Sequence, residues 1–198
     1  MTPTYFSEAI KVLDGQFHNL SFHQKRLDKT LLSFSSKSFI DLSKIEVPSQ
    51  YKKGLVKCRI LYSLTDFHVE FNPYTRKVIN SLKLIHCNTI DYTFKYADRQ
   101  PISELLSHKE NCDDILIVKN GYITDTSFSN VVFENESGLF TPSTYLLRGT
   151  KREYLLQKGI IKSTEIKPED IKYYSKLYMI NAMVDIEDNL SIKTSNII

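Results

Sequence analysis

The stretch Ile123-Thr124-Asp125-Thr126-Ser127-Phe128-Ser129-Asn130-Val131-Val132-Phe133 is the most informative part of this chain. It places one carboxylate and several small hydroxyl side chains directly before an apolar run that is typical of a buried strand. Earlier in the chain, Phe94-Lys95-Tyr96-Ala97-Asp98-Arg99 holds a lysine between aromatic neighbours. Neither segment has the spacing of a phosphate-binding loop or a metal site. The lysine amine and the carboxylate are therefore the candidate reactive groups of these two segments.

A lysine and a carboxylate are the minimum equipment for pyridoxal phosphate chemistry. The lysine amine can form a Schiff base with the cofactor aldehyde, and a carboxylate can hold the pyridinium nitrogen. Together, Lys95 and Asp125 predict a site for this cofactor.

Length and composition are ordinary for a globular protein. The 198 residues allow one or two domains, and 41% of them are apolar and 25% charged. The net charge of +3 comes from 26 basic and 23 acidic residues spread along the chain. Because no basic block stands out, we expect neither nucleic acid nor an anionic membrane as a partner.

The cysteines and the N-terminus predict an intracellular protein without a metal site. Cys58, Cys87 and Cys112 form no Cys-x-x-Cys pair and have no histidine at metal-ligand spacing, so reduced thiols are expected. The segment from Met1 to Glu8 lacks the basic and apolar regions of a signal peptide, and no apolar run approaches membrane-spanning length. The expected location is the cytoplasm.

Two dipeptide turns organise the predicted secondary structure. Asp14-Gly15 predicts a hairpin between strands 5–13 and 16–20, and Asn120-Gly121 predicts a second between strands 114–119 and 122–124. Further strands are expected at 54–63, 67–71, 81–86, 130–134, 139–140, 161–166 and 177–181. Helices are expected at 21–34 with Ser21 as N-cap, in part of 35–48, and at 102–108, 151–158 and 168–171.

Strands and helices mixed without regular alternation indicate an α+β protein. We expect a smaller N-terminal α/β lobe of residues 1–88 and a C-terminal lobe of residues 89–198 that carries the cofactor lysine. The hinge is expected around residues 87–94.

The order of the motifs resembles the class IV aminotransferase family, the fold type IV pyridoxal phosphate enzymes. The motifs occur in this order along the chain: the first hairpin; then His23-Gln24-Lys25-Arg26; then the Lys95 segment; then residues 120–131; and finally Leu146-Leu147-Arg148-Gly149-Thr150-Lys151-Arg152. The likeness runs from Ser7 to about Met183 and is strongest to compact 4-amino-4-deoxychorismate lyases. It implies a two-lobed, D-amino acid aminotransferase-like fold, with a shortened N-terminal lobe because the chain starts almost directly at Phe6.

The resemblance implies roles for particular residues. Lys95 would be the Schiff-base lysine and Arg26 the phosphate ligand, since a guanidinium fork suits a phosphate. Gly149 and Thr150 match a turn that caps the phosphate at a helix start, and Ser129 and Asn130 would lie beside the ring. The implied cofactor-binding set is Arg26, Lys95, Asp125, Ser129, Asn130, Gly149 and Thr150, with Lys95 as the catalytic residue. His23 is better explained as an ordinary buried histidine.

Asp125 departs from the family pattern, which has Glu at this position to keep the pyridine nitrogen protonated. Because the side chain is one methylene shorter, either the strand lies closer to the ring or the bond is weaker by ~1–2 kcal/mol. The candidates for a substrate-carboxylate ligand are Arg59, Tyr92 and Arg99.

The leading functional hypothesis is a 4-amino-4-deoxychorismate lyase that releases pyruvate and 4-aminobenzoate in the folate pathway. A branched-chain or D-amino acid aminotransferase is the alternative, because both reactions begin with the same loss of a Cα proton. A cofactor-binding protein without catalysis is the second alternative. Related enzymes are homodimers, so we expect a homodimer that acts on a small-molecule substrate.

Overall fold

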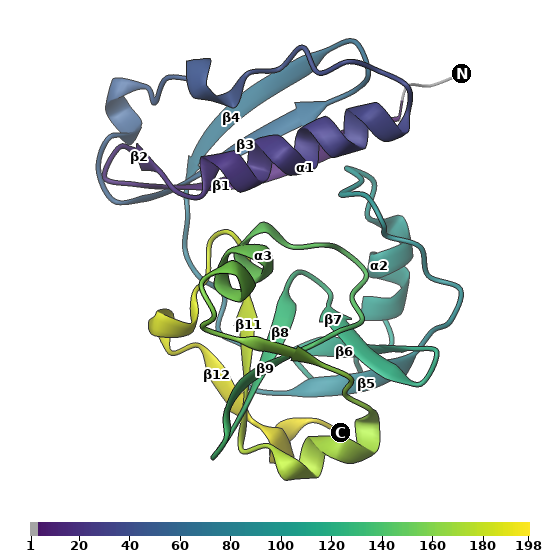
Figure 1. Cartoon of the computed structure of the whole chain (residues 1–198). Helices are drawn as coiled ribbons and strands as arrows, with labels where there is room; N and C mark the ends of the chain where they lie inside the picture. The colour runs from purple at the N-terminus through teal and green to yellow at the C-terminus, as the bar shows by residue number, and fades with distance from the viewer. Residues whose placement is uncertain (1–3) are drawn as a thin grey trace. The chain divides into compact units, whose positions relative to one another are not determined.

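The computed structural model describes residues 4–198 and divides them into two compact units (Figure 1). The first unit contains the chain up to Arg76 together with Phe94–Asp98, and the second contains Lys77–Thr93 and Arg99–Ile198. Both units combine strands with helices, which confirms the α+β class. Met1, Thr2 and Pro3, which belong to the segment predicted not to be a signal peptide, lie outside the described residues.

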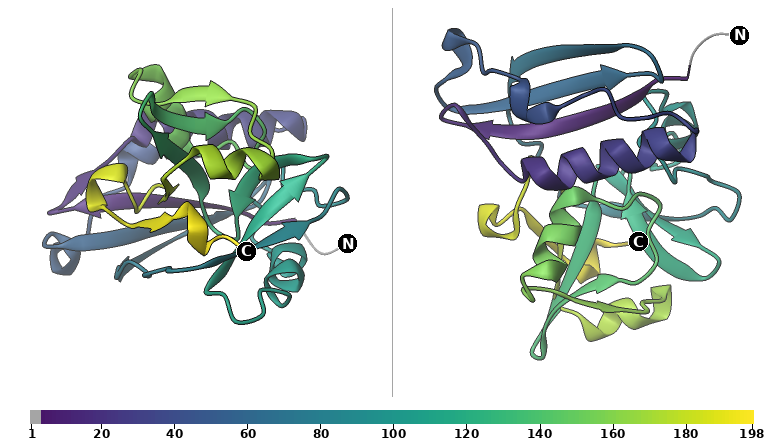
Figure 2. Two further views of the ribbon diagram at one scale, coloured as in Figure 1. Left: turned by 90° about the horizontal axis from the view of Figure 1, so that it is seen from below. Right: turned by 45° about the horizontal axis from the view of Figure 1, so that its top comes forward.

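The first unit is a four-stranded antiparallel sheet with one helix along a face (Figure 2). Its elements are β1 (Phe6–Leu13), β2 (Gln16–Phe17), α1 (Leu20–Ser33), β3 (Leu55–Tyr62) and β4 (Phe67–Pro73), and the strand order is β2-β1-β3-β4. Every second residue of β1 from Phe6 to Val12 is buried, and the apolar ones pack with Leu27 and Leu31 of α1. Asp14 and Gly15 have φ values of 48° and 80°, which confirms the predicted hairpin turn.

The segment around Lys95 returns to the first unit. The Ser7 N–H donates to the Lys95 carbonyl at 2.8 Å, and the ring centroids of Phe94 and Tyr96 lie 6.2 and 5.4 Å from that of Phe6. This division differs from the expected lobes 1–88 and 89–198, because Lys95 belongs to the N-terminal unit. Phe94 and Tyr96 pack against Phe6, which places the Lys95 segment in the first unit. Contacts between residues so far apart in the chain cannot be recognised from a local sequence pattern.

The second unit is built on a mixed sheet. Its strands are β5 (Leu82–His86), β6 (Asp114–Lys119), β7 (Tyr122–Thr126), β8 (Asn130–Asn135), β9 (Gly138–Pro142), β10 (Lys162–Thr164), β11 (Lys176–Ile180) and β12 (Ser191–Lys193). The order is β10-β9-β8-β7-β6-β5, with β11 pairing both β8 and β12. The helices are α2 (Gln100–Leu106) and α3 (Thr150–Gln157). The last four residues of β7 and the first four of β8 are buried, so polar side chains there are shielded from water.

Several local expectations were wrong. The N-cap of α1 is Asn19 rather than Ser21, in a left-handed conformation that Asn tolerates. Residues 35–48 contain one short 3-10 turn, Leu42–Lys44, instead of part of an α-helix. The short helix predicted at 168–171 is present, as the 3-10 helix Pro168–Tyr173. The strand β12 was not anticipated. The second hairpin was confirmed, with φ values of 52° and 82° at Asn120 and Gly121.

Across residues 4–198, every helix is too short or too polar to cross a membrane.

Candidate active site

Glu8 organises a polar cluster in the first unit. It occupies an inward position of β1 between Phe6 and Ile10 and is fully buried. Arg26 on α1 grips it with two bonds, from Nε to Oε1 at 2.8 Å and from Nη2 to Oε2 at 2.5 Å. His23, one helical turn earlier, brings Nδ1 to 2.6 Å from Oε2. One carboxylate therefore fixes both side chains.

The charges in this cluster determine its protonation. Burial alone would raise the pKa of Glu8, but the Arg26 charge and the bonds from His23 and Arg26 lower it to about 2. Burial lowers the pKa of His23, Glu8 opposes this, and the charges of Arg26 and Lys95 lower it further. Neutral His23 therefore donates its Nδ1–H to ionised Glu8. The structure thus brings the two predicted cofactor-binding cations, Arg26 and Lys95, near one histidine.

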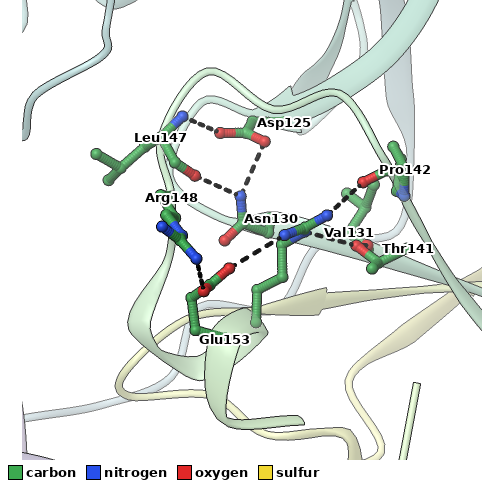
Figure 3. Close-up of polar contacts among 9 residues, drawn as sticks. Asp125, Asn130, Val131, Thr141, Pro142, Leu147, Arg148 and Glu153 are labelled. Carbon is green, nitrogen blue, oxygen red and sulfur yellow. Dashed lines mark hydrogen bonds and ion pairs between the residues drawn. The ribbon is translucent and has the colours of Figure 1, made fainter. Parts of the chain in front are cut away.

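Asp125 is the centre of a second cluster, in the second unit (Figure 3). It lies near the end of β7, opposite Asn130 at the start of β8, and only 6% of it is exposed. The Asn130 amide donates to Oδ1 at 2.9 Å, and the Leu147 N–H donates to Oδ2 at 3.0 Å. Each carboxylate oxygen therefore accepts a bond from a neutral donor.

Asp125 has no ion-pair partner within residues 4–198. Burial raises its pKa to about 7, against the bonds from Leu147 and Asn130 and the more distant charge of Arg152. Burial therefore lets this carboxyl group keep its proton at a much higher pH than an exposed aspartic acid does.

The remaining predicted cofactor residues lie around this cluster. Ser129 bonds to Thr126, with the two hydroxyl oxygens 2.8 Å apart, and closes the turn between β7 and β8. Gly149 is the N-cap of α3, and buried Thr150 is its first residue. The second unit thus gathers Asp125, Ser129, Asn130, Gly149 and Thr150, and their cofactor roles stay predictions.

The candidates for a substrate-carboxylate ligand make contacts of their own. Arg59 lies 3.6 Å from Glu70 on the exposed sheet surface, Tyr92 is buried, and the Arg99 guanidinium donates to the Ser127 carbonyl at 2.5 Å. Their roles toward a substrate stay untested predictions.

Sequence reasoning missed two polar groups. A glutamate in the inward phase of an alternating strand, as at Glu8, is a usable signal, because a buried charge needs partners. Arg152 is only 3% exposed, donates to the Pro142 carbonyl at 2.8 Å and lies 4.8 Å from the centre of the Tyr145 ring. Its motif was recognised, but the spacing gave no hint that its charge reaches Asp125.

Glu8→Gln should lower the free energy of unfolding at pH 7 by about 3 kcal/mol, because it leaves Arg26 without its charged partner. The pKa of Glu8 is about 2 in the fold against an ordinary 4.5, so its ionised form stabilises the fold above pH 4.5. That contribution is lost as the pH falls toward 2. Urea unfolding should therefore show the difference from wild type shrinking over this range.

Glu70→Gln is the matched control on the same sheet. Its ion pair with Arg59 is exposed, so a loss of no more than about 0.5 kcal/mol is expected. Equal losses in the two variants would contradict the central place of Glu8.

Without added cofactor, Asp125 should make the fold less stable as the pH rises from about 4 to about 7. Its pKa is raised from 3.8 to about 7, so the folded chain binds this proton more tightly than the unfolded chain. Asp125→Asn should remove this dependence, which amounts to roughly 4 kcal/mol in full. The quantity to measure is the difference in unfolding free energy between variant and wild type at each pH.

Loss of one hydrogen-bond acceptor in Asp125→Asn adds a constant offset to that difference, but no slope. Exposed Asp91, whose pKa is lowered by bonds from Thr93, serves as control. The difference in stability between Asp91→Asn and wild type should be constant at neutral pH and change only at acidic pH, with a slope of opposite sign. A difference that stays constant from pH 4 to 8 for Asp125→Asn would refute the assignment.

Comparisons with known proteins agree with the resemblance read from the motifs. The family model of amino-transferase class IV matches residues 6–187. An uncharacterized protein of Haemophilus influenzae is 35% identical over 180 residues, 89% of this chain and 96% of that protein. The crystal structure of a candidate 4-amino-4-deoxychorismate lyase from Haemophilus somnus is also 35% identical, with a TM-score of 0.80 over 92% of this chain and 98% of its own.

A more distant structure shares the fold. The branched-chain amino acid aminotransferase of Escherichia coli is 16% identical, with a TM-score of 0.72 over 92% of this chain and 74% of its own. Because the family model spans almost the whole sequence, the chain belongs to the class IV aminotransferase family and is a pyridoxal phosphate-dependent enzyme.

Proposed function

We propose that this enzyme is a 4-amino-4-deoxychorismate lyase, which releases pyruvate and 4-aminobenzoate in the folate pathway of the cytoplasm. The observation that carries the proposal is the 35% identity to the Haemophilus somnus candidate lyase, over 98% of that chain. The distribution of charge in the two polar clusters supports the cofactor roles.

The residues present fit pyridoxal phosphate. Asp125 is a buried carboxyl with two neutral donors and is short of one positive charge, which a protonated pyridine nitrogen would supply. Around His23 in the first unit, the cations Arg26 and Lys95 outnumber the carboxylate Glu8, which favours an anion such as phosphate. When bound, the cofactor supplies an aldehyde that joins to an amine and a ring that accepts electrons from the substrate Cα.

The chain's own residues would then divide the work. Lys95 would hold the aldehyde between turnovers and, once its amine is free, take the proton from the substrate Cα. Arg26, oriented by Glu8, would bind the phosphate, with Gly149 and Thr150 at the start of α3. Asp125 would keep the ring nitrogen protonated, and Ser129 would line the ring.

The alternative reaction is transamination of a branched-chain or D-amino acid, which the same residues permit. The two reactions differ in their products. Purified enzyme given 4-amino-4-deoxychorismate should form equimolar 4-aminobenzoate and pyruvate. A parallel assay contains amino acids and 2-oxoglutarate. If this assay forms a new oxo acid and the first assay forms no 4-aminobenzoate, the enzyme is an aminotransferase and not a lyase.

Lys95→Ala should abolish turnover and the long-wavelength absorbance of lysine-bound cofactor, because alanine has no amine to hold the aldehyde. The fold should persist, since the Lys95 backbone bond to Ser7 is kept. Lys44→Ala, at an 82% exposed lysine of the same unit, is the control and should behave as wild type. Turnover and absorbance unchanged in Lys95→Ala would remove the central assignment.

We also propose that the enzyme is a homodimer. Large apolar side chains are exposed where the end of α1 and its following segment approach the turn before β4, and the Phe39 and Phe67 rings there lie 6.3 Å apart. They are Leu32, Phe34, Phe39, Leu64 and Phe67. An exposed cluster of this kind is typical of an association surface.

Light scattering should give twice the chain mass of 23.0 kDa. Leu32→Lys, at a residue that is 73% exposed, should weaken the dimer without unfolding the chain, whereas Val78→Lys, at an exposed valine of the second unit, should not. A fully active species with the mass of one chain at micromolar concentration would contradict the dimer.

A further inference from the structure

We propose that Asn130 is a positioning residue, whose side-chain amide fastens the Asp125 carboxylate to the loop that leads into α3. This assigns Asn130 to Asp125 rather than to direct contact with the cofactor. The inference rests on the proposed role of Asp125 toward the ring nitrogen, but its first test is made without cofactor.

Three hydrogen bonds join Asp125, Asn130 and Leu147 in a closed ring (Figure 3). Asn130 Nδ2 donates to Asp125 Oδ1 at 2.9 Å and to the Leu147 carbonyl at 3.0 Å. The Leu147 N–H returns a bond to Asp125 Oδ2 at 3.0 Å. Both hydrogens of the Asn130 amide are therefore used, and the loop residue is both donor and acceptor.

This ring also sets which way the amide points. Nδ2 faces a carboxylate oxygen and a carbonyl oxygen, so a flipped amide would place Oδ1 against two acceptors. In the observed orientation, Oδ1 is turned toward Gly149. The donors of Asn130 are thus spent inside the protein, which leaves none for the cofactor.

Gly149 is shaped to this amide. A Cβ built on Gly149 would lie 1.9 Å from Asn130 Oδ1, far inside any real contact. Yet its backbone, with φ −72° and ψ 137°, suits any residue. The five other glycines of the chain all have positive φ. Glycine is therefore required at position 149 because a larger residue would collide with the Asn130 side chain, and not because of the backbone conformation.

The arrangement links the two parts of the proposed cofactor site within the second unit. Asp125 at the end of β7 would serve the ring nitrogen, and Gly149 and Thr150 begin the helix assigned to the phosphate. Asn130 touches both Asp125 and Gly149. A change in its amide should therefore be felt at the carboxylate and at the start of α3.

The first test follows the Asp125 carboxyl by NMR as the cofactor-free protein is titrated. Asn130→Ala removes the side-chain donor to the ionised form, so the titration midpoint should rise by about one pH unit. Asn130→Asp keeps the shape but adds a second carboxyl, and should raise the midpoint further. Asn135→Ala, on the same strand with only a local bond to Ser137, is the control and should leave it unchanged.

The second test uses the contact with Gly149. Gly149→Ala should lower the melting temperature by roughly 3–10 °C, because the new methyl group meets a fixed amide. In the Asn130→Ala background, the same change should cost almost nothing. Equal costs in both backgrounds would show that the amide does not occupy this space.

The third test is the dissociation constant of pyridoxal phosphate, which should rise roughly tenfold in Asn130→Ala and stay unchanged in Asn135→Ala. An unshifted Asp125 midpoint in Asn130→Ala would overturn the inference, whatever happens to stability. If the midpoint shifts in Asn130→Ala but the wild-type protein binds no pyridoxal phosphate, the positioning of Asp125 by Asn130 is supported and the proposed cofactor role of Asp125 is removed.

Discussion

A carboxylate removed from water must be given donors or a cation, and this requirement shapes both units of the enzyme. Glu8 and Asp125 are buried to nearly the same degree, 0% and 6% exposed, but their surroundings differ. Glu8 accepts a bidentate guanidinium and an imidazole N–H, and its pKa falls to about 2. Asp125 receives bonds from neutral donors, the Asn130 amide and backbone N–H groups, and its pKa rises to about 7. The first carboxylate is satisfied within its unit, while the second is left short of a charge.

This contrast assigns different work to the two groups. A carboxylate that is fully paired serves to hold its partners, as Glu8 holds Arg26 and His23. A buried acid whose charge is only partly compensated is typical of a functional site, because a ligand can complete it. The neutral donors around Asp125 orient the carboxylate without cancelling its charge. In the role proposed for Asp125, cofactor binding would offset the cost in stability of burying this acid.

Most of the fold could be predicted from local patterns. The turns Asp14-Gly15 and Asn120-Gly121 were correctly placed, because two successive positive φ values demand such residues. The strand β6 was predicted at its observed bounds from its continuous apolar run. The return of the Lys95 segment to the first unit could not be predicted, because it depends on contacts between Phe6 and two aromatic residues far along the chain.

The same distinction applies to the site. Lys95, Arg26 and Asp125 were selected by residue type and motif order, which a sequence displays. The Leu147 N–H was not, because any residue at that position offers the same backbone donor. A glycine usually indicates a backbone position with positive φ. At position 149, however, glycine is needed because the Asn130 side chain occupies the space that a Cβ would fill. Such a constraint between two residues far apart in sequence becomes visible only when both are placed.

The structure also shows a consequence of Asp125 in place of the expected Glu that the sequence does not reveal. Judged from sequence, the shorter side chain loses reach toward a ring nitrogen and so weakens one bond. In the fold, its short length keeps both carboxylate oxygens within 3.0 Å of the Asn130 amide and the Leu147 N–H. A glutamate would carry its carboxylate one methylene further and add a torsion to be fixed. The shorter side chain is therefore held in orientation through both of its oxygens by groups of the protein itself.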